Sequence, residues 1–153
     1  MRSLAVAAIT LSLAGCSDES LRRSDSPIAS SASLGHFNPP LPSNAFDIYF
    51  LDFAGGLQDL EKFVRFSVPP TEVGSAVDKM IARNNRQMGR SLVYPLQSIA
   101  AAPTITPRSG FLPMPWWTPS AISSGYYRGE QDSYALQIWV DTASGTIFVY
   151  QND

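Results

Sequence analysis

Cysteine and histidine are almost absent from this chain, whose 153 residues include one cysteine, Cys16, and one histidine, His36. A single cysteine forms no disulfide within the chain and cannot supply a zinc site of several thiolates. Beyond His36 there is no imidazole for a Ser-His-Asp triad or a histidine-ligated zinc. These shortages exclude the commonest metal centres and covalent catalytic sites from the C-terminal part of the chain.

Excess charge of either sign is also missing, since 11 basic and 13 acidic residues give a net charge of −2. Nucleic-acid binding draws on a basic patch, so the composition argues against a nucleic-acid partner. No glycine-rich loop ends in Lys-Ser or Lys-Thr, and Ala54-Gly55-Gly56 is too short to cradle a phosphate.

A pair of carboxylates is the remaining device for catalysis, of the kind that hydrolyses glycosides. The acids available for it are Asp47, Asp52, Asp59, Glu61, Glu130, Asp132 and Asp141. They fall at expected strand ends and turns, where acids commonly serve solubility. We therefore expect no enzymatic activity, no metal and no cofactor.

The most apolar stretch, residues 4–14, is shorter than the roughly 20 residues that a membrane-spanning helix needs. It fits the apolar part of a secretory signal peptide. The stretch leads into Leu13-Ala14-Gly15-Cys16, which resembles the lipobox of bacterial lipoproteins. The resemblance implies removal of a signal peptide at 1–15 and acylation of Cys16. The alternative is an ordinary signal peptide with a chance cysteine.

Acylation at Cys16 implies a lasting membrane anchor, because each buried methylene contributes about 0.8 kcal/mol and two or three chains act together. In enterobacterial lipoproteins, an aspartate directly after the acylated cysteine favours the inner membrane. Ser17 occupies that position here. The resemblance therefore favours the outer membrane of the cell envelope, with the protein facing the periplasm.

Residues 16–42 are rich in serine and proline and have no apolar periodicity. Such a segment buries too little surface to offset the entropy of ordering it, so we expect a flexible tether. As a random coil it spans roughly 30 Å. His36 lies in it and has no expected role. Residues 43–153 are expected to form a single domain.

Alternating and aromatic-rich residues predict strands at 46–53, 60–68, 134–141 and 146–151, with Tyr126 and Tyr127 starting another and 92–94 as a short edge strand. Apolar residues at helical spacing predict one helix between Pro70 and Gly89, capped by Thr71. The order predicts an α+β fold in which one amphipathic helix packs on a four- to five-stranded, mostly antiparallel sheet.

Two groups of side chains are candidates for binding. One face of the expected helix carries four basic residues, Lys79, Arg83, Arg86 and Arg90. This face either binds an acidic partner or anionic lipid head groups, or is simply an outer face exposed to solvent. Trp116 and Trp117 lie in a proline-rich loop, residues 92–120. With Tyr126 and Tyr127 they either stack on a ligand such as a glycan or pack as a lid on the sheet.

A second resemblance lies in the expected domain, which looks like small uncharacterised bacterial lipoproteins in three segments: Arg65-Phe66-Ser67-Val68-Pro69-Pro70, Trp116-Trp117-Thr118-Pro119 and the ending Gly145-Thr146-Ile147-Phe148-Val149-Tyr150-Gln151. Those proteins have no established activity that the resemblance could imply. We expect a non-catalytic envelope lipoprotein that binds another envelope protein or has a structural role. The alternative is a module that binds a glycan or small molecule through the Trp/Tyr-rich loop.

Overall fold

The computed structural model describes residues 20–29, 31, 40–55, 59–130 and 135–152. The expected signal peptide, the lipidation site Cys16 and His36 lie outside these residues.

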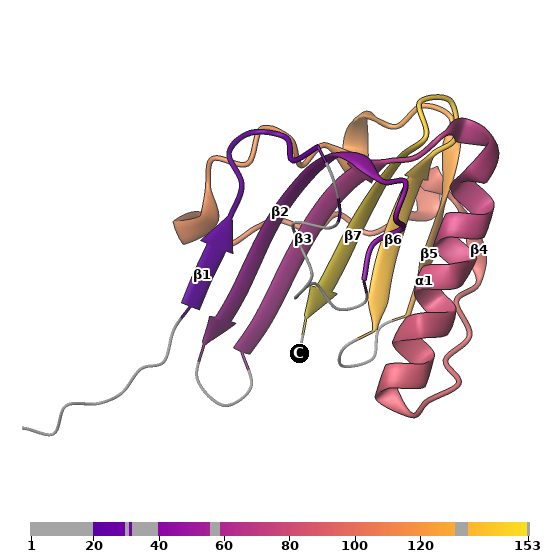
Figure 1. The fold of residues 1–153 in the computed structure, drawn as a ribbon, viewed down its shortest axis with the longest axis horizontal. Helices are drawn as coiled ribbons and strands as arrows, with labels where there is room; N and C mark the ends of the chain where they lie inside the picture. The colour runs from indigo at the N-terminus through magenta and orange to yellow at the C-terminus, as the bar shows by residue number, and fades with distance from the viewer. Residues whose placement is uncertain (1–19, 30, 32–39, 56–58, 131–134, 153) are drawn as a thin grey trace, which may run out of the picture.

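The core of the fold is a seven-stranded sheet in the order β1-β2-β3-β7-β6-β5-β4 (Figure 1). Every pairing between its strands is antiparallel. The strands are β1 (Ser20–Arg23), β2 (Phe46–Gly55), β3 (Asp59–Ser67), β4 (Leu96–Ser98), β5 (Gly125–Gly129), β6 (Leu136–Asp141) and β7 (Thr146–Asn152). Within the described residues one α-helix packs on this sheet, so the predicted α+β class is confirmed, whereas the predicted count of four to five strands is wrong.

Both edge strands explain the difference in count. Strand β1 lies within the expected tether, yet its four residues pair with residues 51–54 of β2. Strand β4 has three residues and pairs with β5. Side chains on both strands are largely exposed, so pairing rests on backbone hydrogen bonds and leaves no apolar alternation in the sequence. The expectation of a flexible tether is therefore wrong for Ser20–Arg23.

The predicted edge strand at residues 92–94 is also wrong, because Tyr94 turns inward there. Its hydroxyl oxygen accepts hydrogen bonds from the Asn84 side chain and from the backbone N–H of Leu136, both at 3.2 Å. Its carbonyl oxygen accepts one from Arg128 at 3.1 Å. Tyr94 thus ties the segment after the helix to the sheet, and β4 begins two residues later.

The helix α1 (Val73–Met88) follows a 3-10 turn, η2 (Pro70–Glu72). Thr71 is not its cap, because Glu72 occupies the N-cap position and no side chain bonds there. Gly89 ends the helix as predicted, in the left-handed conformation with φ of 60°. Further 3-10 turns are η3 (Ile99–Ala101), η4 (Ser109–Phe111) and η5 (Pro119–Ala121).

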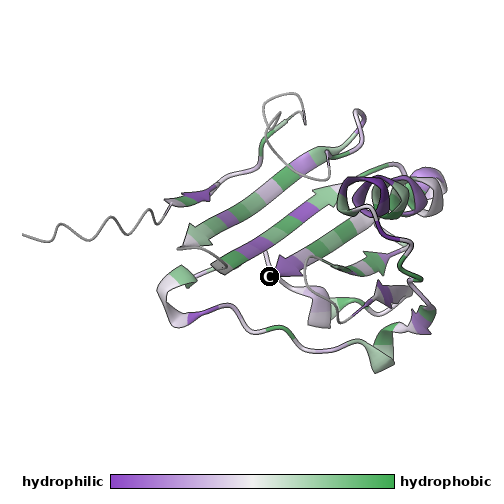
Figure 2. Ribbon diagram, turned by 90° about the horizontal axis from the view of Figure 1, so that it is seen from below, coloured by the Kyte–Doolittle hydropathy of each residue, from purple (hydrophilic) through white to green (hydrophobic). Residues whose placement is uncertain are grey.

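Apolar side chains are buried on both faces of the sheet. On the first face, α1 covers a core whose members include Ile48, Phe50, Val64, Phe66, Ile138, Val140, Ile147 and Val149. The second face presents Leu51, Phe63, Tyr127, Trp139, Phe148 and Tyr150. Residues 99–122, here called the strap, cross this second face (Figure 2). A single helix cannot cover both faces, and the proline-rich loop therefore acts as the second layer.

Candidate functional site

The strap is held on the sheet by an aromatic cluster centred on Trp117. Its ring centroid lies 4.9 Å from that of Phe63, 5.7 Å from Trp139 and 5.7 Å from Phe148. All three contacts are edge to face, the arrangement that the ring quadrupoles favour. Trp117 is 9% exposed and Trp139 is 2% exposed. Trp117 therefore fills the apolar cluster between the strap and the second face of the sheet, here called the second core.

Trp116 is buried beside Trp117, although adjacent side chains in an extended chain point in opposite directions. The chain is not extended there: the N–H of Trp117 donates to the carbonyl oxygen of Met114 at 3.0 Å, which closes a turn. The turn brings both indoles toward the sheet, where Trp116 stacks on Tyr49 with centroids 5.7 Å apart. Of the two alternatives for this loop, the structure thus favours the lid.

A basic residue of the N-terminal strand clamps the strap. The guanidinium group of Arg23 donates to the carbonyl oxygens of Phe111 at 3.1 Å and Pro113 at 2.9 Å. Asp25 holds the same guanidinium in an ion pair. The strap is therefore fixed partly by a strand that the sequence pattern does not predict.

A second clamp uses a buried carboxylate. Glu61 is 5% exposed on β3, and its Oε2 lies 2.8 Å from Nε of Arg108 on the strap. Its Oε1 accepts a hydrogen bond from the Tyr150 hydroxyl at 3.3 Å. Burial, together with the negative charge of Glu61 and the hydrogen bond to it, raises the pKa of Tyr150 to about 12, against a smaller lowering by Arg108. The ion pair between Glu61 and Arg108 thus holds the strap against β3.

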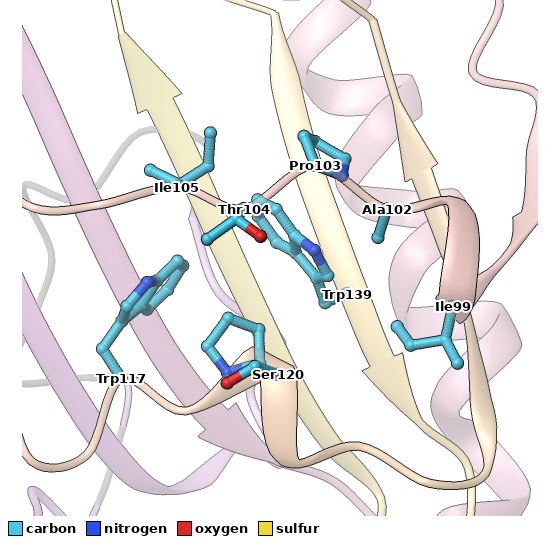
Figure 3. Close-up of a pocket in the computed structure, with 9 residues that line it drawn as sticks. Ile99, Ala102, Pro103, Thr104, Ile105, Trp117, Ser120 and Trp139 are labelled. Carbon is cyan, nitrogen blue, oxygen red and sulfur yellow. The ribbon is translucent and has the colours of Figure 1, made fainter.

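A cavity of about 250 Å³ opens between two arms of the strap. Figure 3 shows Trp117 and Trp139 in its wall, with Thr104 and Ser120 as the hydroxyl-bearing neighbours. Its remaining lining residues are Ile99, Ala102, Pro103, Ile105 and Pro119. Within the described residues, the buried indole N–H groups of Trp116 and Trp117 have no hydrogen-bond partner. The cavity therefore combines apolar walls with an unsatisfied donor on one wall residue, Trp117.

The predicted aromatic set is only partly assembled. Tyr127 lies in the second core, 5.3 Å from Trp139, and its hydroxyl donates to Gln137 at 3.3 Å. Burial raises its pKa to about 12, with Glu130 adding to the shift. Tyr126 instead packs against the core beneath α1. Burial raises its pKa, against the lowering effect of Arg128. The sheet thus separates Tyr126 from the two tryptophans.

The predicted arginines lie apart from this aromatic site, on α1. Arg83 is half-buried and donates to the carbonyl oxygen of Pro40 at 3.2 Å, whereas Arg86 is exposed in the last turn. Trp139, by contrast, is a member of the cavity that the sequence analysis does not single out. The signal was its place in the alternating strand 134–141, on the opposite face from Ile138.

Among the described residues, the two most exposed large apolar side chains lie at the start of β4 and just before it, at one edge of the sheet. Val93 is 76% exposed and Leu96 is 72% exposed. Strand β4 pairs only with β5 among the strands that the structure describes, so its outer edge is open. An open edge flanked by apolar side chains is a surface that another chain can join.

The described carboxylates are mostly engaged in structural contacts. Asp47 pairs with Arg65 at 3.0 Å, Glu61 pairs with Arg108, and Asp78 pairs with Arg128. Asp141 accepts hydrogen bonds from the backbone and the hydroxyl of Ser144 in the β6–β7 turn. In the ranges that the structure describes, no three His, Cys, Asp or Glu residues gather in a way that could hold a metal ion.

None of the helices in the described part of the chain is both long enough and apolar enough to cross a membrane. The chain matches no protein-family model, no curated protein sequence and no solved structure.

Proposed function

We propose that this protein is a non-catalytic lipoprotein of the bacterial envelope, anchored through Cys16 and binding a protein partner by strand addition at β4. The anchor rests on the lipobox resemblance at residues 13–16. Its membrane is the outer one, with the domain in the periplasm, by the same resemblance. The partner is a second envelope protein that offers an extended segment.

The observation that carries the interaction is the open β4 edge with Val93 and Leu96 exposed beside it. Main-chain hydrogen bonds to an added strand supply affinity, and the two apolar side chains supply contacts for its alternate residues. Natural proteins usually protect such edges with short strands or charges, or cover them. Strand β4 is short, but none of its three residues is charged, and the exposed apolar side chains of Val93 and Leu96 favour binding at this edge.

The test is site-specific photo-crosslinking in intact cells, with the crosslinker at Val93. We expect one discrete adduct that disappears when Leu96→Lys places a charge on the edge. The matched control is Phe46→Lys, at another exposed apolar residue, on β2 near the opposite edge of the sheet. An adduct pattern that is the same in Leu96→Lys and Phe46→Lys contradicts the proposed interaction. The mass of the mature N-terminus tests the anchor separately, since an unmodified Cys16 contradicts it.

The cavity in the strap favours a second candidate, a module that binds a small ligand or one ring of a glycan. At about 250 Å³ the cavity lies just below the usual 300–1,000 Å³ of ligand pockets, so it suits a compact group. Trp117 and Trp139 line the cavity, and indole rings can stack on a sugar ring or another flat group.

Tryptophan fluorescence with cell-wall glycan fragments tests this second candidate. Binding shifts the emission in the wild type and in Ala100→Leu, whose site is exposed and outside the cavity. Ala102→Leu fills the cavity and abolishes the shift. No shift in the wild type, or an equal shift in both variants, excludes the cavity as the site.

A further inference from the structure

The N-terminal segment is held along one edge of the sheet rather than trailing from it. Strand β1 pairs with β2, and Ser24 continues the contact through two hydrogen bonds of 2.9 Å with the backbone of Phe50. Ile28 and Ile48 then exchange backbone bonds of 2.8 and 3.1 Å. The described part of the fold therefore includes residues from Ser20 to Ile28, within the segment expected to be a tether.

This early start leaves little chain between the anchor and the fold. Only residues 17–19 separate Cys16 from Ser20. Four residue steps, even fully extended, span at most about 14 Å. By contrast, the flexible tether expected at residues 16–42 would reach roughly 30 Å. Once Cys16 carries acyl chains, Ser20 has to stay within about 14 Å of the lipid.

The opposite edge of the sheet lies beyond that reach. At the two edges of the seven-stranded sheet, β1 and β4 lie six strand spacings of about 4.8 Å apart, or about 29 Å in all. An orientation with the β4 edge against the membrane would lift Ser20 roughly 29 Å above it, which the short connection forbids. The remaining orientations place the β1 edge or one face of the sheet at the bilayer.

Exposed apolar side chains select the β1 edge. Leu21 is 48% exposed and lies opposite Phe53, on the face that the strap covers. Leu112 of the strap is 53% exposed, and Arg23 bonds to the carbonyl oxygens on either side of it. Two apolar side chains thus project from the corner of the domain where the anchor is attached. Interfacial lipid is the environment that such side chains favour.

We infer that the β1 edge, through Leu21 and Leu112, rests on the lipid bilayer and that the β4 edge consequently points away from it. The inference rests on the proposed lipidation of Cys16. It gives the proposed binding edge a position, about 29 Å from the membrane and open to a partner in the periplasm. The strap, clamped to β1 by Arg23, is part of the membrane-facing corner.

The chain offers a matched pair of labels for the test. Cys16 is the only cysteine, so an introduced cysteine is the only free thiol once Cys16 is acylated. Leu112→Cys and Leu96→Cys both replace exposed leucines, one at each edge. Each lipoprotein is labelled with a polarity-sensitive dye and reconstituted in vesicles of phosphatidylethanolamine and phosphatidylglycerol.

We expect the dye at position 112 to shift to shorter wavelength on reconstitution, relative to detergent-free protein that begins at Ser17 and so lacks both Cys16 and its acyl chains, and the dye at position 96 to keep its aqueous emission. A 20-residue Gly/Ser insertion before Ser20 removes the shift at 112. Equal emission from both positions, or a shift at 96 alone, overturns the inference.

Mass analysis of the same samples separates the two proposals. An acylated Cys16 with equal emission at the two positions refutes the orientation and leaves the lipoprotein proposal standing. An unmodified Cys16 refutes the anchor, and the orientation falls with it.

Discussion

The indole rings of Trp117 and Trp139 meet edge to face with their centroids 5.7 Å apart, one from the strap and the other from the centre of the sheet. This contact joins the proline-rich loop to β6 and makes the loop a structural layer. It also forms one wall of the cavity. Stability and any ligand binding by the cavity therefore depend on the same side chains.

Truncation of the central indole is expected to be severe. Trp117→Ala removes contacts with Phe63, Trp139 and Phe148, and a change of this kind in a core costs about 3–5 kcal/mol. Urea unfolding of the mature chain measures it. Val93→Ala, at a site 76% exposed, changes the free energy of unfolding by less than about 0.5 kcal/mol. Similar losses in the two variants would show that the strap does not pack as described.

Stability is expected to fall in alkali because two buried tyrosines resist ionisation. The pKa values of Tyr127 and Tyr150 are raised from 10.0 to about 12 in the folded protein. Between these values the unfolded chain releases protons that the folded chain keeps, so unfolding becomes easier as pH rises. The contribution is fully present below pH 10 and is lost toward pH 12.

The measurement is the free energy of unfolding against pH. Relative to the wild type, Tyr127→Phe with Tyr150→Phe flattens the decline between pH 10 and 12, since neither phenyl ring can ionise. An unchanged slope in the double variant means that other groups cause the alkaline loss.

Two left-handed glycines are expected to differ in their tolerance of alanine. A Cβ at Gly145, where φ is 76°, would lie 2.1 Å from the carbonyl oxygen of Val68, whereas a Cβ at Gly89, where φ is 60°, meets nothing within 4 Å. Gly89→Ala costs only the left-handed strain of about 1–2 kcal/mol. Gly145→Ala costs more and weakens the hydrogen bond from Val68 N–H to its carbonyl oxygen. Thermal unfolding of the two variants ranks them, and a smaller cost at Gly145 contradicts the close approach of the turn.

The clamp by Arg23 is expected to control the local opening of the strap. Arg23→Ala removes the hydrogen bonds to Phe111 and Pro113, so amide exchange in Ser109–Phe111 becomes faster. A loss of about 1–3 kcal/mol in global stability accompanies it, as for charge-assisted hydrogen bonds. The neighbour Arg22 is exposed and serves as the control, with Arg22→Ala leaving strap exchange unchanged. Equal exchange in both variants contradicts a clamp made by β1.

Part of the candidate site can be predicted from local rules alone. Tyr126 and Tyr127 are neighbours on a strand, and alternation by itself places them on opposite faces, so they cannot both join the tryptophans. The inward position of both Trp116 and Trp117 cannot be predicted in this way, because it depends on the turn closed by Met114 and Trp117.

The sequence by itself determined the central strands, the helix and its end at Gly89, because apolar periodicity and a left-handed glycine are local signals that survive in any context. Only the tertiary structure decided that Ser20–Arg23 joins the sheet, that the strap forms its second layer and that Glu61 lies buried against Arg108. Edge pairing uses backbone groups that every residue carries, and burial of a charge requires a partner 47 residues away in the chain. Neither produces a local pattern in the sequence. The placement of the N-terminal strand, and with it the inferred orientation on the membrane, therefore depends on contacts between segments that are distant in the chain.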